Sequence, residues 1–203
     1  MRVRARAGGL WAALLLWGAL AQPVAAHTEE VIRYGSFFGG FFHPVLGPDH
    51  LLAMLSVGIV STQMGGRSIL TVPATFVVFM TLGGIFGLTS GVIPMEVIEL
   101  GIAASVLILG GMIAAGPRIP TPVVYVAVGF FGCLHGYAHG VETPAIAEPV
   151  LYAFGFVFGT ATIHLFGVLI GEVAKRYSRG VPALRAGGAA FSLIGALFLF
   201  GVL

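Results

Sequence analysis

Charged side chains are scarce in this 203-residue chain: Asp, Glu, Lys and Arg together make up 9% of it, against 58% for hydrophobic residues. Soluble domains carry about 25% charged residues, so the composition excludes an ordinary soluble domain and predicts an integral membrane protein. The small excess of basic residues is spread over short connections. There it sets the orientation in the membrane, and it does not indicate a nucleic-acid partner.

Cysteine and nucleotide-binding motifs are also missing. Cys133 is the single cysteine of the sequence, which excludes an intrachain disulfide and an all-thiolate metal cage. No Gly-x-x-x-x-Gly-Lys phosphate-binding loop occurs, so we expect no nucleotide as a partner and no ATP hydrolysis by this chain. The Gly-x-Ser-x-Gly motif of many serine hydrolases is absent as well.

The first 26 residues have the three parts of a secretory signal peptide. A start with three arginines is followed by an apolar segment at residues 10–20 and by the small residues Val-Ala-Ala at 24–26. We therefore expect cleavage after residue 26, and a mature domain of residues 27–203 in a bacterial inner membrane. Its new amino terminus, His27, would face the periplasm or the exterior. An uncleaved first helix is the alternative.

Six apolar segments of about the length that crosses a bilayer follow the signal peptide. Gly- and Pro-rich turns separate them, as in a bundle of helical hairpins. The sequence therefore predicts an all-α integral membrane protein with six transmembrane helices. The segments are 35–63, 68–90, 95–115, 121–142, 149–172 and 186–203.

The basic residues indicate which helix ends face the cytoplasm. With an outer amino terminus, the connections after the first, third and fifth spans lie inside, and only Arg33 falls on the outer side. This distribution agrees with both the span count and the cleaved signal. The basic residues of the three inner connections are Arg67, Arg118, Lys175, Arg176, Arg179 and Arg185.

Ionisable residues and prolines interrupt the first span, where residues 43–50 are His-Pro-Val-Leu-Gly-Pro-Asp-His. Each proline removes a backbone donor, so we expect a broken helix whose freed carbonyls face a cavity. Ionisable groups at membrane depth usually mark the path of an ion or substrate. His43, Asp49 and His50 together offer the nitrogen and oxygen ligands that a first-row divalent cation accepts.

A second motif, His-Gly-Tyr-Ala-His-Gly-Val-Glu at residues 135–142, ends the fourth span. His135, His139 and Glu142 have i,i+4 and i,i+3 spacing, so they project from one face of a helix and can chelate one ion. A single intramembrane histidine is often only a hydrogen-bonded contact between helices. The whole cluster instead favours metal or proton handling at a site between spans one and four.

Three other residues receive simpler interpretations. His164 is isolated in the fifth span and is interpreted as a structural contact to a polar neighbour such as Thr160. Met54, one turn beyond His50, is interpreted as core. His27 could capture an ion at the entrance through its imidazole and free α-amine.

The two motifs also suggest an internal repeat. Residues 38–43 are similar to residues 130–135 when His43 is aligned with His135. Three spans separate the two segments, so the halves would form a 3+3 inverted repeat, which places a substrate site at their interface. A chance match between Gly- and Phe-rich segments is the alternative.

The pattern His-Pro-x-x-Gly-x-Asp-His at 43–50 resembles the signature of the HupE/UreJ family of nickel/cobalt permeases. The resemblance continues through residues 49–55, 99–107 and 135–142 and covers nearly the whole mature chain. It implies secondary transport or facilitated diffusion of Ni²⁺ or Co²⁺ across the inner membrane, for the maturation of hydrogenase or urease. It also implies functional roles for His43, Asp49, Glu99, His139 and Glu142, joined by His50 and His135. The choice of Glu99 rests on the resemblance alone.

We therefore predict a permease and not an enzyme, with the lipid bilayer and a divalent metal ion as partners and no permanent cofactor. The ligand types do not separate Ni²⁺ from Co²⁺ or Zn²⁺, because affinity follows the same order at most such sites. The alternatives are an intramembrane zinc-dependent hydrolase, with Glu142 as its base, and a metal-sensing subunit of a larger importer. The oligomeric state is not predicted.

Overall fold

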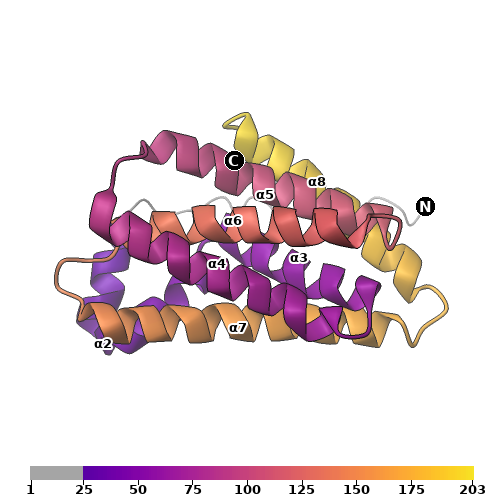
Figure 1. Ribbon diagram of the computed structural model, residues 1–203, viewed down its shortest axis with the longest axis horizontal. Coiled ribbons are helices and arrows are strands. Elements are labelled where there is room, and N and C mark those ends of the chain that lie inside the picture. Colours follow the sequence, from indigo (N-terminus) through magenta and orange to yellow (C-terminus); the bar gives the residue numbers. More distant parts are fainter. Residues whose placement is uncertain (1–24) are drawn as a thin grey trace, which may run out of the picture.

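The computed structural model describes the backbone of residues 25–203 and the side chains from Arg33 onward, and this part of the chain is all-helical (Figure 1). Most of the predicted signal peptide and the side chain of His27 lie outside the described residues. The helices are α2 (Ala25–Leu46), α3 (Pro48–Met64), α4 (Ser68–Ser90), α5 (Met95–Ala115), α6 (Thr121–Val141), α7 (Pro149–Ala174) and α8 (Gly180–Leu199).

A sharp bend divides the first predicted span into α2 and α3. The axes of Arg33–Leu46 and Pro48–Met64 differ in direction by 81°, with Gly47 between them at φ −80° and ψ 110°. A residue before proline is disfavoured in the helical region, whereas proline itself is tolerated in the first turn of a helix. Pro48 therefore ends one helix and starts the next, and the predicted interruption is confirmed.

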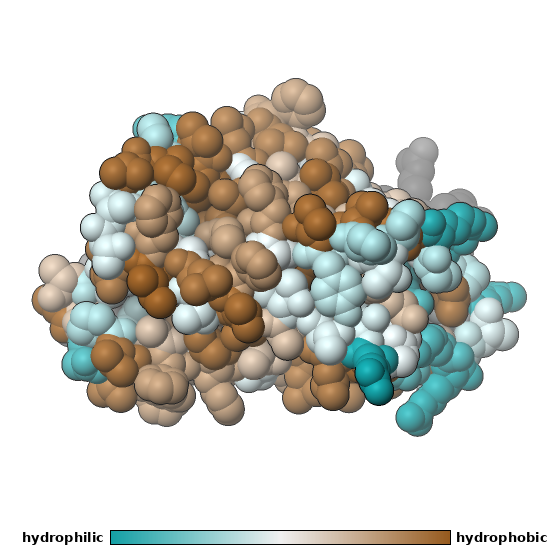
Figure 2. All heavy atoms as spheres, viewed as in Figure 1, coloured by the Kyte–Doolittle hydropathy of each residue, from teal (hydrophilic) through white to brown (hydrophobic). Residues whose placement is uncertain are grey.

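The helices are long and apolar enough for a multi-span membrane protein. Five of them, α4 to α8, qualify as separate spans, and the bent pair α2–α3 makes a sixth candidate. Figure 2 shows apolar side chains over most of the visible face, as expected of a surface that contacts lipid. The inverted repeat stays a prediction.

Helix α3 lies at the centre of the bundle. It packs against every other described helix, and ten of its 17 residues are buried. Met54 is fully buried in this core, so its interpretation as a core residue is confirmed. Around α3, the closest partners are α4 with α6, α5 with α8, and α2 with α7. The amino-terminal end of α3, where the motif lies, is thereby held inside the bundle.

Helices α4 and α6 are in direct backbone contact. A Cβ atom at Gly136 would overlap the carbonyl oxygen of Met80, and one at Gly140 would overlap that of Gly84. Small residues of this kind let membrane helices pack closely. Both glycines belong to the second motif, so the face of α6 next to its histidines is fixed against α4.

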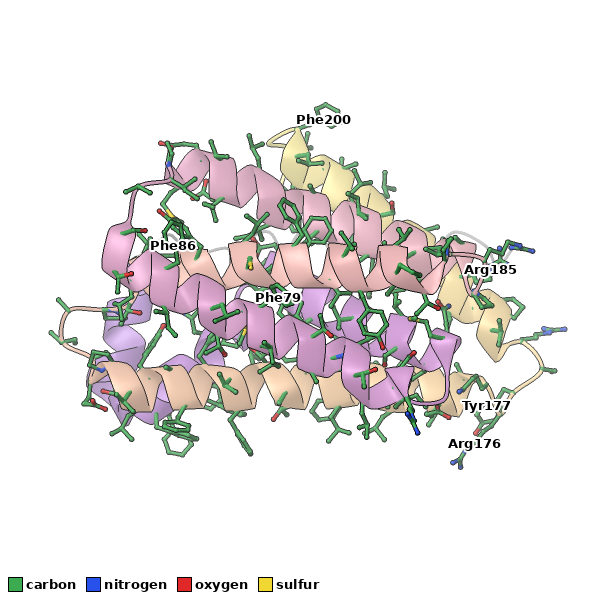
Figure 3. The ribbon with its side chains drawn as sticks, in the orientation of Figure 1. Phe79, Phe86, Arg176, Tyr177, Arg185 and Phe200 are labelled. Carbon is green, nitrogen blue, oxygen red and sulfur yellow. The ribbon has the colours of Figure 1, made fainter. Side chains whose placement is uncertain are left out.

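Basic side chains gather at one end of the bundle. Arg176 and Arg185 lie there together (Figure 3), where Lys175 Nζ donates to the carbonyl of Thr62 at 3.3 Å. The ends of α3 and α7 therefore meet at this end, as the predicted topology requires. Which side of the membrane it faces stays a prediction.

The last helix differs from its predicted bounds. Helix α8 runs from Gly180 to Leu199, whereas the sequence predicted residues 186–203. Arg185 was assigned to the connection, but it lies within α8, and its Nε donates to the carbonyl of Ala114 at 2.7 Å. Pro182 is tolerated because it falls in the first turn of the helix. The guanidinium group of Arg185, which the sequence alone placed in a loop, is thus hydrogen-bonded to the end of α5.

Candidate metal site

His43 lies near the carboxyl end of α2, and its side chain is 4% exposed. Its Nδ1 is 3.0 Å from the hydroxyl of Tyr152 on α7, and its Nε2 is 3.7 Å from a carboxylate oxygen of Glu142. The ring is thus held between α7 and the end of α6. Because α2 packs along α7, the sequence-distant Tyr152 can orient the first histidine of the motif.

Asp49 and His50 form a compact pair in the first turn of α3. The Asp49 Oδ1 accepts hydrogen bonds from the backbone N and from the Nδ1 of His50, both at 2.8 Å. With the Nδ1 proton directed at this carboxylate, the His50 Nε2 carries the lone pair that can bind a metal. That Nε2 atom is buried and has no hydrogen-bond partner among the described residues.

His135 is oriented in the same way by a serine on α5. The Ser105 Oγ donates to the carbonyl of Ile102 at 2.6 Å and lies 3.0 Å from the His135 Nε2. A hydroxyl has one proton, so Ser105 accepts from the Nε2–H of His135, and the lone pair is on Nδ1. The Nδ1 atom is buried with no hydrogen-bond partner among the described residues.

Two sets of three candidate ligands result, and His139 belongs to both. The first consists of His43, His139 and Glu142, and the second of His50, His135 and His139. Within each set, one ligand atom from every residue lies within 4.8 Å of the others. The ring centroid of His139 is 4.5 Å from that of His43 and 4.5 Å from that of His50. The two sets are therefore adjacent and share a ligand.

The spacing suits a first-row divalent cation after small side-chain rotations. Metal–nitrogen bonds of about 2.1 Å place opposite ligands about 4.2 Å apart, slightly closer than the upper limit found here. Imidazole nitrogen and carboxylate oxygen match nickel, cobalt and zinc. Each set thus offers the ligand types and about the spacing that such an ion requires.

Glu142 directly follows the last residue of α6 and is 21% exposed. Burial raises the pKa of its carboxyl group; His50 acts in the opposite direction, and the negative charges of Asp49 and Glu99 add to the increase. A divalent cation in the first set would reverse this effect, because it stabilises the ionised carboxylate.

A cavity of about 130 Å³ opens beside the first set, between α4, α6 and α7. His139 and Tyr152 contribute to its wall, and the rest of the wall is mostly apolar, including Met80, Phe156 and Val157. The shared histidine therefore borders an open space in the bundle.

The structure brings together five of the seven residues chosen from the sequence: His43, His50, His135, His139 and Glu142. Asp49 lies outside both sets and supports His50 instead. Glu99, in α5, is exposed and belongs to neither set, although its charge acts on Glu142.

Two hydrogen-bonding partners were missed from the sequence, and one interpretation was wrong. Tyr152 and Ser105 are separated from their histidines by 109 and 30 residues, and no local pattern links them. A lone serine in the apolar run 99–107 is the only available signal. His164 does not pair with Thr160, whose hydroxyl is directed at the sulfur of Met80 at 3.6 Å.

Comparison with known proteins assigns the chain to a family. A sequence model of the family described as HupE / UreJ protein matches residues 13–198. The chain belongs to the HupE/UreJ family. Protein HupE of Rhizobium leguminosarum bv. viciae is 36% identical over 184 residues, which is 90% of this chain and 94% of that protein. No solved structure matches the chain. The HupE/UreJ family is associated with nickel and cobalt uptake, and its members are metal transporters rather than enzymes.

Proposed function

We propose that this HupE/UreJ family protein carries Ni²⁺ or Co²⁺ across the bacterial inner membrane, by secondary transport or facilitated diffusion, to supply metalloenzyme maturation. The observation that carries the proposal is the pair of buried ligand sets joined by His139. His43, His139 and Glu142 receive the ion at the predicted outer end, and His50 and His135 take it deeper into the bundle.

A shared ligand is useful for transport because the ion never loses all its protein ligands at once. An ion that leaves His43 and Glu142 can remain on His139 while His50 and His135 replace the lost bonds. Conduction needs binding strong enough to offset lost hydration and weak enough for release. Imidazoles with a single carboxylate meet both conditions better than a thiolate cage.

The hydrogen bonds from His50 to Asp49 and from His135 to Ser105 support the same function. Each holds a histidine with its free lone pair directed away from its hydrogen-bonding partner. Partners of this type raise ligand basicity and fix the ring orientation. The site is thus arranged for an incoming ion before that ion arrives.

The hydrolase alternative is weaker, since members of the HupE/UreJ family are transporters. The sensor alternative can be distinguished from a permease by experiment. A subunit of a larger importer does not move metal alone, whereas a permease does so in sealed vesicles without ATP.

The proposal is tested by reconstituting the full chain in liposomes that contain a metal-sensitive dye, and by measuring Ni²⁺, Co²⁺ and Zn²⁺ influx without ATP. We expect influx by the wild type and a loss of about tenfold or more in Asp49→Ala and His139→Ala. Glu172→Ala is the matched control, because Glu172 pairs with Lys175 at the basic end of the bundle. Absence of influx by the wild type rejects the permease. Full influx by Asp49→Ala removes the first motif from the pathway.

A further inference from the structure

His164, in the middle of α7, is a buried histidine that neither ligand set uses. Its side chain is 2% exposed, and both ring nitrogens are buried with no hydrogen-bond partner among the described residues. A neutral imidazole has one donor and one acceptor, and burying both without partners is costly. A structural contact between helices does not explain the residue, because such a contact would satisfy at least one nitrogen.

Phe76 of α4 lies between His164 and the second ligand set. This ring is fully buried, and its centroid is 5.5 Å from that of His135 and 5.1 Å from that of His164. A continuous row of rings therefore leads from the first ligand set to His164. In order, the row consists of His43, His139, His50, His135, Phe76 and His164.

His164 lies nearer the basic end of the bundle than the first ligand set does. Tyr152, which contacts His43, precedes His164 by twelve residues on α7, which corresponds to about 18 Å along a helix. One turn before His164, Thr160 directs its hydroxyl at the Met80 sulfur, and Met80 lies one turn from Phe76. The facing sides of α4 and α7 thus place a contact between a hydroxyl and a thioether one turn before His164 on α7.

We propose that His164 is a third binding position for the transported divalent cation and that Phe76 is the barrier in front of it. The inference rests on the proposed transport function. When the Phe76 ring rotates aside, an ion held by His50 and His135 can pass to the His164 imidazole. A single protein ligand holds the ion more weakly than three, which favours release toward the basic end. In the resting position the ring interrupts any continuous water path.

The experiment uses the full chain in liposomes, with influx measured beside equilibrium Ni²⁺ binding by the detergent-purified protein. We expect His164→Gln to bind Ni²⁺ within about twofold of the wild type, because both three-residue sets remain, and to lose about tenfold in influx. Influx by His164→Gln equal to that of the wild type overturns the assignment. If the wild type shows no influx, the proposed function fails first, and the inference fails with it.

A second variant separates a ligand role from a packing role. His164→Cys replaces the imidazole by a softer thiolate, and we expect the ratio of Zn²⁺ to Ni²⁺ influx to change by about threefold or more. A residue that only fills space would leave this ratio unchanged, and an unchanged ratio overturns the assignment. This measurement also decides the matter if His164→Gln does not fold.

The barrier has its own matched pair of variants. Phe76→Leu shortens the fully buried ring side chain, and we expect faster Ni²⁺ influx. Phe79→Leu is the control, because Phe79, labelled in Figure 3, is on the same helix but is 41% exposed, and its ring lies beside Gly129 of α6. Equal influx rates for the two variants reject Phe76 as the barrier.

Discussion

Ser105 holds His135 in one tautomer across the contact between α5 and α6. The hydroxyl donates to the carbonyl of Ile102 at 2.6 Å, so it must accept the Nε2–H of His135 at 3.0 Å. This tautomer leaves the lone pair on the Nδ1 of His135, which is a member of the candidate set with His50 and His139. A serine in an apolar helix thereby determines which nitrogen of a histidine on another helix carries the lone pair.

The Ser105→Ala variant should weaken metal binding without unfolding the bundle. The loss of the acceptor lets the His135 ring rotate and change tautomer, which should reduce Ni²⁺ affinity by about tenfold in isothermal titration. Ser61→Ala is the control: Ser61 is equally buried and also donates to a carbonyl three residues earlier, but its hydroxyl contacts no histidine. Equal affinities for the two variants would remove Ser105 from the site.

The Tyr152→Phe variant should act on the first ligand set alone. Its hydroxyl lies 3.0 Å from the Nδ1 of His43, so its removal takes one hydrogen bond from this ring and weakens its orientation toward Glu142. We expect a loss of about tenfold in Ni²⁺ influx at low concentration. Tyr137→Phe is the control, because that hydroxyl bonds to the backbone of Ile93 and contacts no candidate ligand. A larger loss in the control would indicate that bundle stability, and not ligand orientation, limits influx.

Metal uptake should fall in acid. Histidine and glutamate must lose their protons to bind a cation, so protons compete with the metal for these ligands. Burial raises the pKa of Glu142, so this carboxylate is also protonated at a higher pH than an exposed glutamate. Uptake at about pH 5 should therefore be lower than at about pH 7, measured in liposomes with the same pH on both sides. Unchanged uptake would contradict histidine ligation.

The Gly136→Ala variant should destabilise the contact between α4 and α6. The added Cβ would overlap the carbonyl oxygen of Met80, and a backbone cannot move aside as a flexible side chain can. We expect a loss of about 1–3 kcal/mol in the free energy of unfolding, seen as a lower melting temperature. In Gly187→Ala the new methyl group meets nothing within 4 Å, so this helical substitution should be neutral or slightly stabilising. A melting temperature for Gly136→Ala at or above that of the wild type would contradict the close contact.

Residue order predicted much of this site because both motifs are local. The i,i+4 spacing of His135 and His139 puts both on one face of α6 whatever the rest of the fold does. Pro48 breaks the first span at Gly47 for an equally local steric reason. Glu99 is different: its selection came from family resemblance, and the structure leaves it exposed, outside both ligand sets.

The sequence by itself determined the membrane class, the helical spans, the broken first span and most of the candidate ligands, since these follow from hydrophobicity, proline sterics and helical periodicity. Only the tertiary structure decided that His139 serves two ligand sets and that Ser105 and Tyr152 orient their histidines. It alone placed Phe76 between His135 and His164. These relations depend on which helices pack together, and contacts between residues 30 to 109 positions apart leave no periodic trace in the chain.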